Sequence, residues 1–232
     1  MSYLIVVAHP DDEVLGAGGI IWKLSQNGEE VNVCVMSGLA TARTLRPSDE
    51  QLVADTEKSM SLLGVKKRIM GDFPNIKLNT VPHLELVQFI EKAIVETNAD
   101  VIITHHPADL NNDHLHTSLA CQAASRLFQR RKDIRPLKQL LYMEVLSATE
   151  WSMNKTLGQF NPNTYVEIGE QGINKKLEAL SMYRDVMREY PHPRSAEALR
   201  GLAAYRGGQS GCNFAEAFEC VFRRVEDYAK ND

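Results

Sequence analysis

Short apolar segments alternate with longer segments of helical periodicity along this chain. Two runs rich in β-branched residues, 4–8 and 31–36, predict strands, and the apolar positions Ile20, Ile21 and Leu24 between them predict a helix. The same pattern predicts further strands at 67–70, 100–104, 140–145 and 164–168. Further helices are predicted at 49–63, 81–97, from Asn112 or Asp113 to about 128, 174–188 and 196–205. Strands alternating with helices favour a mostly parallel sheet covered on both faces. We therefore predict an α/β fold, a Rossmann-like three-layer α/β/α sandwich.

The composition agrees with one folded unit. The 232 residues contain no repeat, no low-complexity tract and no linker rich in proline, glycine or serine, so we expect a single domain over residues 1–232. Hydrophobic residues make up 44% of the chain and charged residues 24%, as in ordinary globular proteins. The net charge of −4 argues against a general nucleic-acid-binding protein, but it allows a small anionic substrate held by local arginines.

Targeting and anchoring signals are not visible in the sequence. No segment approaches the roughly 18 consecutive apolar residues of a membrane span, and no basic segment followed by an apolar core marks a signal peptide. The four cysteines lack a Cys-x-x-Cys spacing, so we expect them to be reduced. These observations lead us to expect a cytoplasmic protein without a membrane span.

The candidate chemistry begins where the first predicted strand ends. Residues 8–13 are Ala-His-Pro-Asp-Asp-Glu, which places one imidazole and three carboxylates within a few residues. Histidine nitrogens and carboxylate oxygens bind zinc, a further carboxylate can move a proton, and ligands bind at strand ends in α/β folds. The alternative is structural, because acidic residues commonly open helices, where the helix dipole favours negative charge. We interpret the segment as half of a metallohydrolase site.

A second cluster follows the strand predicted at 100–104. Residues 105–116 contain four of the seven histidines of the chain. If the two strands are near neighbours in a parallel sheet, the loops that follow them meet at the same edge. On a helix His114 and His116 would lie about 200° apart, so we choose His114, which is nearer the helix start, as the candidate ligand. His105 and His106 face opposite ways in an extended chain, which leaves open which of them lines the site.

Together these segments resemble a known family, the LmbE/PIG-L-type zinc-dependent N-deacetylases, which remove acetyl groups from substrates that contain N-acetylglucosamine. The resemblance rests on residues 8–13, on Gly16, Gly18 and Gly19, and on the pair Asp113-His114. It extends to 72–74, 191–195 and 215–218, and so covers nearly the whole chain. It implies a small-molecule partner, an N-acetylated sugar whose carrier stays open. Related proteins often assemble, so a homo-oligomer is compatible with the resemblance.

The resemblance also implies roles for individual residues. His9, Asp12 and His114 would bind zinc, and Asp11 would be the general base that assists attack of metal-bound water on the acetyl carbonyl. The same set of two histidines and one aspartate also suits Fe(II). Glu13 and Asp113 are expected to support the ligands, because a ligating histidine normally gives its second N–H to a carboxylate.

The oxyanion site departs from the family pattern. Many members have a histidine that helps the oxyanion, where this chain has Asn111. An asparagine side chain can donate a hydrogen bond, but it carries no charge and supplies no proton. Oxyanion support is therefore expected from Asn111, His106 or His192.

Substrate contacts are expected from Arg43, Asp72, His106 and Arg194. Arg43 and Asp72 follow predicted strand ends, and the resemblance supports a sugar at Asp72. An arginine side chain suits phosphate or carboxylate groups. His192 and Arg194 lie in a proline-bracketed loop that could close over the pocket.

Three other functions fit parts of the same pattern. The segment 16–19, Gly-Ala-Gly-Gly, superficially resembles the glycine-rich turn of a dinucleotide-binding module. Its distance from the first strand does not fit, and no acidic residue closes the second strand. A metallohydrolase of another amide or ester would use the same ligands. A catalytically silent metal-binding relative would have no need of Asp11 beside the ligands.

Overall fold

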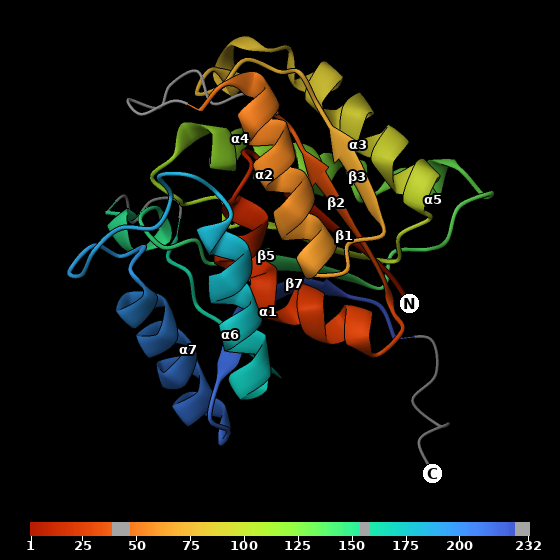
Figure 1. The fold of residues 1–232 in the computed structure, drawn as a ribbon. Coiled ribbons are helices and arrows are strands. Elements are labelled where there is room, and N and C mark those ends of the chain that lie inside the picture. The colour runs from red at the N-terminus through yellow and green to blue at the C-terminus, as the bar shows by residue number, and fades with distance from the viewer. Residues whose placement is uncertain (39–46, 154–157, 226–232) are drawn as a thin grey trace.

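A seven-stranded sheet forms the centre of the molecule. The computed structural model describes residues 1–38, 47–153 and 158–225, and within them the strand order is β3-β2-β1-β4-β5-β7-β6 (Figure 1). The strands are β1 (Ser2–Val7), β2 (Glu30–Val35), β3 (Lys67–Met70), β4 (Val101–His105), β5 (Gln139–Met143), β6 (Thr164–Glu167) and β7 (Ala215–Arg223). Strands β1 to β5 pair in parallel, whereas β7 is antiparallel to both β5 and β6.

Helices cover both faces of the sheet. They are α1 (Asp12–Gln26), α2 (Asp49–Leu62), α3 (His83–Thr97), α4 (Asn112–Ala124), α5 (Leu127–Arg130), α6 (Gly169–Ser181) and α7 (Ala196–Ser210), with short 3₁₀ turns η1 (Leu78–Thr80) and η2 (Thr149–Trp151). Helices α1 and α2 both pack against α6, while α3 and α4 pack together on the opposite face (Figure 1). No helix in the described segments is long and apolar enough to cross a membrane. The predicted three-layer sandwich is confirmed.

The central strand β1 explains how the two helical layers are held. Its side chains alternate between the faces, so Ile5 and Val7 join the core beneath α1 and α6, while Leu4 and Val6 join the core beneath α3 and α4. All four are fully buried. A strand covered on both faces has to be apolar throughout, which is why this segment forms a continuous hydrophobic run rather than an alternating one.

The strand order places a crevice beside β1. The chain leaves β1 through α1 toward β2 on one side, and it later returns to the other side of β1 as β4. In doubly wound sheets, ligands bind at such a reversal, outside the carboxyl ends of the two strands. The loops that follow β1 and β4 carry the two clusters singled out in the sequence, so both clusters lie at this crevice.

The glycines of α1 serve packing. A Cβ atom at Gly16 would lie 2.4 Å from Sδ of Met143 in β5, and one at Gly19 would lie 2.7 Å from Cδ1 of Ile168. These glycines let α1 approach the sheet and the start of α6 closely, which removes the reason to interpret residues 16–19 as a phosphate-binding turn. The helix is also broken at Ala17, where φ is −144°.

Most predicted elements form within one or two residues of the expected bounds. The exceptions are β7, α4, α6, which begins at Gly169 rather than at 174, and α7, which continues to Ser210 rather than ending at 205. Strand β7 was not predicted as a strand. Helix α6 ends at Ser181 rather than continuing to residue 188, because the chain turns beyond it and Asp185 adopts a left-handed φ of 58°. Helix α4 is capped by Asn111, not by Asn112 or Asp113, and it stops at Ala124 before the separate turn α5.

Candidate metal centre

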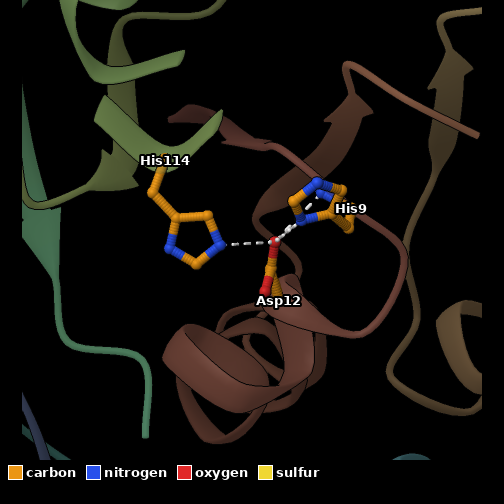
Figure 2. Close-up of side chains that lie close together, drawn as sticks. All are labelled: His9, Asp12 and His114. Atoms are coloured by element: carbon orange, nitrogen blue, oxygen red, sulfur yellow. Dashed lines mark hydrogen bonds and ion pairs between the residues drawn. The ribbon is translucent and has the colours of Figure 1, made fainter. Parts of the chain in front are cut away.

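Two histidines and one aspartate meet at the crevice beside β1. His9 follows β1, Asp12 is the first residue of α1, and His114 lies in the first turn of α4. Figure 2 shows the two imidazole rings on either side of the Asp12 carboxylate. All three side chains are buried, with exposed fractions of 8%, 1% and 2%. Residues about one hundred positions apart in the sequence thus form one cluster, as the position of the two strands predicts.

One oxygen atom is the centre of this cluster. Oδ2 of Asp12 lies 3.3 Å from Nδ1 of His9 and 3.3 Å from Nε2 of His114 (Figure 2). The same oxygen accepts a hydrogen bond from the backbone N–H of His9 at 3.0 Å, which closes the turn between β1 and α1. The potential ligand atoms of the three residues lie within 4.8 Å of one another.

A further carboxylate lies next to the ring nitrogen of each histidine that faces away from Asp12. Nε2 of His9 lies 3.0 Å from Oδ2 of Asp113, and Nδ1 of His114 lies 2.9 Å from Oδ2 of Asp109. An ionised carboxylate only accepts hydrogen bonds, so these outer nitrogens carry the hydrogens. The inner nitrogen of each ring is therefore the one available to a metal ion.

Asp113 is itself firmly held. Its two oxygens accept hydrogen bonds from the backbone N–H groups of Ile76, at 2.7 Å, and Leu78, at 2.9 Å. Burial opposes the charged form, but the hydrogen bond with His9 and those from the two backbone groups hold the pKa of Asp113 below its usual value. The supporting role predicted for Asp113 agrees with this contact.

The residues present fit a metal ion. A lone pair on a ring nitrogen repels a carboxylate oxygen, so a proton or a cation has to lie between Asp12 and each inner nitrogen. Nε2 of His114 is buried and has no hydrogen-bond partner among the described residues. Two imidazoles backed by carboxylates, with an aspartate between them, form a donor set typical of zinc and also suited to Fe(II).

The charges of the cluster favour a cation as well. Burial by itself would lower the pKa of His114, but Asp12 and Asp109 raise it to about 10. Burial would likewise raise the pKa of Asp12, yet His114 and His9 hold it well below its usual value. A metal ion and a proton therefore compete for the same nitrogen of His114.

His105 supports the cluster from the side. Its Nε2 accepts the backbone N–H of Ala8 at 2.9 Å, so the ring hydrogen lies on Nδ1, 3.9 Å from Asp109. Its ring stacks on His114 with the centroids 3.7 Å apart. Burial and the neighbouring His114 lower the pKa of His105 well below its usual value. His105, Asp109 and His114 could also be taken as a metal-binding group, but a protonated Nδ1 on His105 argues against it.

His106 points to a different environment. Its Nδ1 accepts the backbone N–H of Ala108 at 3.1 Å, and its Nε2 lies 3.5 Å from Oε2 of Glu219. The rings of Tyr142 and Phe160 meet it edge-on. Both ring nitrogens thus already face partners within the protein, which leaves a substrate contact by His106 as a prediction only.

Asp11 lies in the chain between the candidate ligands His9 and Asp12 and is 2% exposed. Its backbone has a left-handed φ of 105°. The backbone N–H donates to Oε2 of Glu13 at 3.0 Å, and Oδ2 lies 3.5 Å from a terminal nitrogen of Arg194. Glu13 therefore contacts Asp11, and the prediction that it supports a ligating histidine was wrong.

The remaining predicted site residues are spread around the crevice. Oδ1 of Asn111 accepts the backbone N–H of Asp113 at 3.0 Å, which caps α4 and leaves the side-chain NH₂ as its donor. Nε of Arg194 donates to the hydroxyl of Ser147 at 2.7 Å. His192 is exposed, and its Nδ1 accepts the backbone N–H of Arg194 at 3.0 Å.

Two predicted substrate contacts, Arg43 and Asp72, follow β2 and β3 in the sequence. Asp72 is exposed and forms an isolated antiparallel bridge with Ser37, so these two loops lie side by side. Arg43 lies outside the described residues.

Sequence reasoning missed two members of the site. Asp109 lies five residues before His114, and its carboxylate within the histidine-rich segment was the available signal. Tyr183, whose hydroxyl donates to Oε1 of Glu13, comes from the turn after α6 and had no local signal at all.

Comparisons with known proteins identify the family and the fold. A family model described as GlcNAc-PI de-N-acetylase (PIG-L) matches residues 4–125. A protein of Escherichia coli (strain K12) named uncharacterized deacetylase YaiS is 27% identical over 192 residues, which cover 78% of this chain and 89% of that protein.

Two solved structures share the fold. The conserved protein TT1542 from Thermus thermophilus superposes with a TM-score of 0.77 at 23% identity, over 100% of both chains. The N,N'-diacetylchitobiose deacetylase from Pyrococcus horikoshii superposes with a TM-score of 0.75 at 22% identity, over 95% of this chain and 83% of that one. The family model covers more than half of the chain and includes all three candidate ligands. The chain therefore belongs to the LmbE/PIG-L family of deacetylases.

Proposed function

We propose that this protein is a metal-dependent hydrolase that removes the acetyl group from an N-acetylated amino sugar or its conjugate. His9, Asp12 and His114 would hold the ion, zinc or Fe(II). The observation that carries the proposal is the convergence of two imidazoles on Oδ2 of Asp12, each backed by a buried carboxylate. A purely structural metal site normally closes with four protein ligands, whereas three leave room for substrate.

An ion bound here would polarise the acetyl carbonyl and lower the pKa of water. The protein supplies the proton transfers. Asp11, adjacent to Asp12 and nearly fully buried, would accept the proton of the attacking water and return it to the leaving amine. Arg194 lies beside the Asp11 carboxylate and would hold it in place, because it is anchored in turn by the hydroxyl of Ser147.

Asn111 would stabilise the oxyanion by donating a hydrogen bond. Its Oδ1 is engaged by the backbone N–H of Asp113, which orients the side-chain amide and leaves the NH₂ group as donor. A neutral donor would suffice if the ion carries most of the charge stabilisation. His192 is the other candidate, and it would have to move from its exposed position to take part.

The names of the family and of one structurally similar protein support the proposed substrate class. The archaeal relative is named for the acetylated disaccharide N,N'-diacetylchitobiose, and the family for an N-acetylglucosamine lipid. Asp72, exposed on the loop after β3, would bind sugar hydroxyls, and Arg43 would bind an anionic group of the substrate.

Metal content and acetate release test the proposal together. The purified protein should contain about one zinc or iron per chain by mass spectrometry, as expected for a three-ligand site. It should also release acetate from N-acetylglucosamine or N,N'-diacetylchitobiose. The Asp11→Asn variant should keep the metal and lose most activity, whereas His114→Ala should lose both.

His116→Ala is a matched control, because His116 lies on the same helix two residues from the ligand and is only partly buried. It should retain both metal and activity. A protein that takes up no metal when zinc is offered, or an Asp11→Asn variant with near-wild-type turnover, would contradict the proposal.

A further inference from the structure

The conformation of Asp11 requires support from elsewhere in the molecule. Its φ of 105° and ψ of −29° lie in the left-handed region, which is unfavourable for a residue with a Cβ atom. Such conformations persist only where the surrounding structure holds them, and they concentrate at functional sites. The question is which contacts hold this one.

A buried pair of side chains, Glu13 in α1 and Tyr183 in the turn after α6, is linked to the Asp11 backbone. Oε2 of Glu13 accepts the Asp11 N–H at 3.0 Å, and Oε1 accepts the hydroxyl of Tyr183 at 2.5 Å. Glu13 is 0% exposed and Tyr183 is 1% exposed. Complete burial of a carboxyl group costs free energy unless its oxygens accept hydrogen bonds. Here both oxygens of Glu13 have donors.

Tyr183 is a fixed partner. Its ring belongs to the core beneath α1 and α6. The next residue, Arg184, donates its backbone N–H to Oδ2 of Asp55 in α2 at 3.3 Å, and its side-chain Nε lies 3.3 Å from the same oxygen. The turn after α6 is therefore tied to α2 while its tyrosine reaches Glu13 in α1.

We propose that Tyr183 and Glu13 are positioning residues that hold Asp11 in its left-handed conformation, through hydrogen bonds from the tyrosine hydroxyl to the Glu13 carboxyl and from the Asp11 N–H to the same carboxyl. The inference rests on the proposed function in one respect, namely that Asp11 is the base. Glu13 follows Asp12 in α1, but the hydrogen bonds of its side chain go to the Asp11 N–H and the Tyr183 hydroxyl and not to the candidate ligands, so loss of the pair displaces the base without removing the metal. A displacement of about 1 Å can cost about a hundredfold in rate.

Two conservative variants test the pair. Tyr183→Phe keeps the ring and removes the hydroxyl, and Glu13→Gln keeps the shape but leaves one acceptor oxygen for two donors. With N,N'-diacetylchitobiose as substrate, each should lower kcat by about ten- to a hundredfold. We expect KM to stay within about twofold of the wild type, because substrate binding does not pass through the pair. Metal content per chain should be unchanged.

Tyr165→Phe is the matched control. Tyr165 lies on β6 and donates its hydroxyl to the backbone oxygen of Pro162 at 3.3 Å. Removal of the Tyr165 hydroxyl should leave kcat unchanged.

The double variant Glu13→Gln/Tyr183→Phe shows whether the two residues act as one unit. If they do, the kcat of the double variant should be no lower than the kcat of the less active single variant. Independent, multiplicative losses would overturn the proposal.

A readout independent of turnover completes the test. In crystals of Tyr183→Phe and of Glu13→Gln with metal content confirmed, φ of Asp11 should leave the left-handed region or its N–H should lose its partner. An unchanged Asp11 in both variants overturns the proposal, as does an effect on KM alone. If the wild type releases no acetate, the deacetylase proposal fails, while the crystal structures still decide whether the pair positions Asp11.

Discussion

The Asp12 carboxylate has the central role among the residues of the site. It closes the turn after β1 through the backbone N–H of His9, and it faces both candidate histidine ligands with one oxygen. Local sequence marked the two segments that carry His9, Asp12 and His114, because imidazole and carboxylate groups concentrate at two predicted strand ends, and the family resemblance implied these three as the ligands. Asp109 was missed although it lies in the histidine-rich segment, because its position there does not by itself distinguish a carboxylate that supports a histidine from a solvated one.

The role of Asp109 is open to a direct test. Asp109→Asn keeps the size of the side chain but removes the charge that backs His114. We expect zinc affinity to fall by about 10- to 100-fold, the usual effect of losing such a partner. Competition with a chelator would measure it. Asp133→Asn, which alters an exposed pair with Arg131, is the control, and equal affinities for the two variants would refute the assignment.

The raised pKa of His114 predicts how metal binding depends on pH. The neighbouring carboxylates raise this pKa to about 10, so the imidazole is protonated in neutral solution and the metal has to displace its proton. Apparent zinc affinity should therefore rise by about tenfold for each pH unit between about pH 7 and pH 9. Calorimetric titration in buffers of different protonation enthalpy would detect the released proton. An affinity that does not change over this range would contradict the assignment of His114 as a ligand.

At the scale of elements, α1 depends on a contact from the end of the chain. The break at Ala17 frees backbone donors in the second half of the helix, and Glu216 of β7 accepts the N–H groups of Gly19, at 2.9 Å, and Ile20, at 2.7 Å. The same carboxylate pairs with buried Lys176 at 2.7 Å. The glycines of this segment resemble a dinucleotide-binding turn only superficially, and the structure shows a helix held against its neighbours.

Removing the Glu216 side chain should be costly. Glu216→Ala would leave Lys176 buried without its partner and two backbone donors unsatisfied, so we expect a loss of about 3–5 kcal/mol in the free energy of unfolding. Urea denaturation followed by circular dichroism would measure the loss. Glu178→Ala, which breaks an exposed pair with Lys175, should change stability by less than about 1 kcal/mol. Similar values for both variants would show that the buried contact does not stabilise α1.

On the scale of the whole molecule, the candidate metal centre joins two separate parts of the fold. His9 and Asp12 come from the β1–α1 connection, and His114 comes from α4 on the opposite face of the sheet. A bound ion therefore links the two helical layers at the crevice between β1 and β4.

Removal of the metal should lower the stability of the folded protein. A ligand present at a hundred times its dissociation constant adds about 2.7 kcal/mol, provided that it binds only the native state. The melting temperature should fall after chelator treatment and recover when zinc is restored. An Asp12→Ala variant should show no response to either step. If neither chelator treatment nor added zinc changes the melting temperature of the wild type, the result would argue against a metal site that joins the two helical layers.

Sequence alone determined the alternation of strands and helices, the burial of β1 on both faces and the two histidine- and carboxylate-bearing segments at strand ends. These are local properties, because periodicity and short-range residue spacing encode them. Only the tertiary structure decided that β4 pairs with β1, that the antiparallel β7 completes the sheet, and that Asp109 and Tyr183 reach the site. Such contacts join residues far apart in the chain, and they depend on which strands pair and how helices pack across them. No local pattern in the chain records those choices.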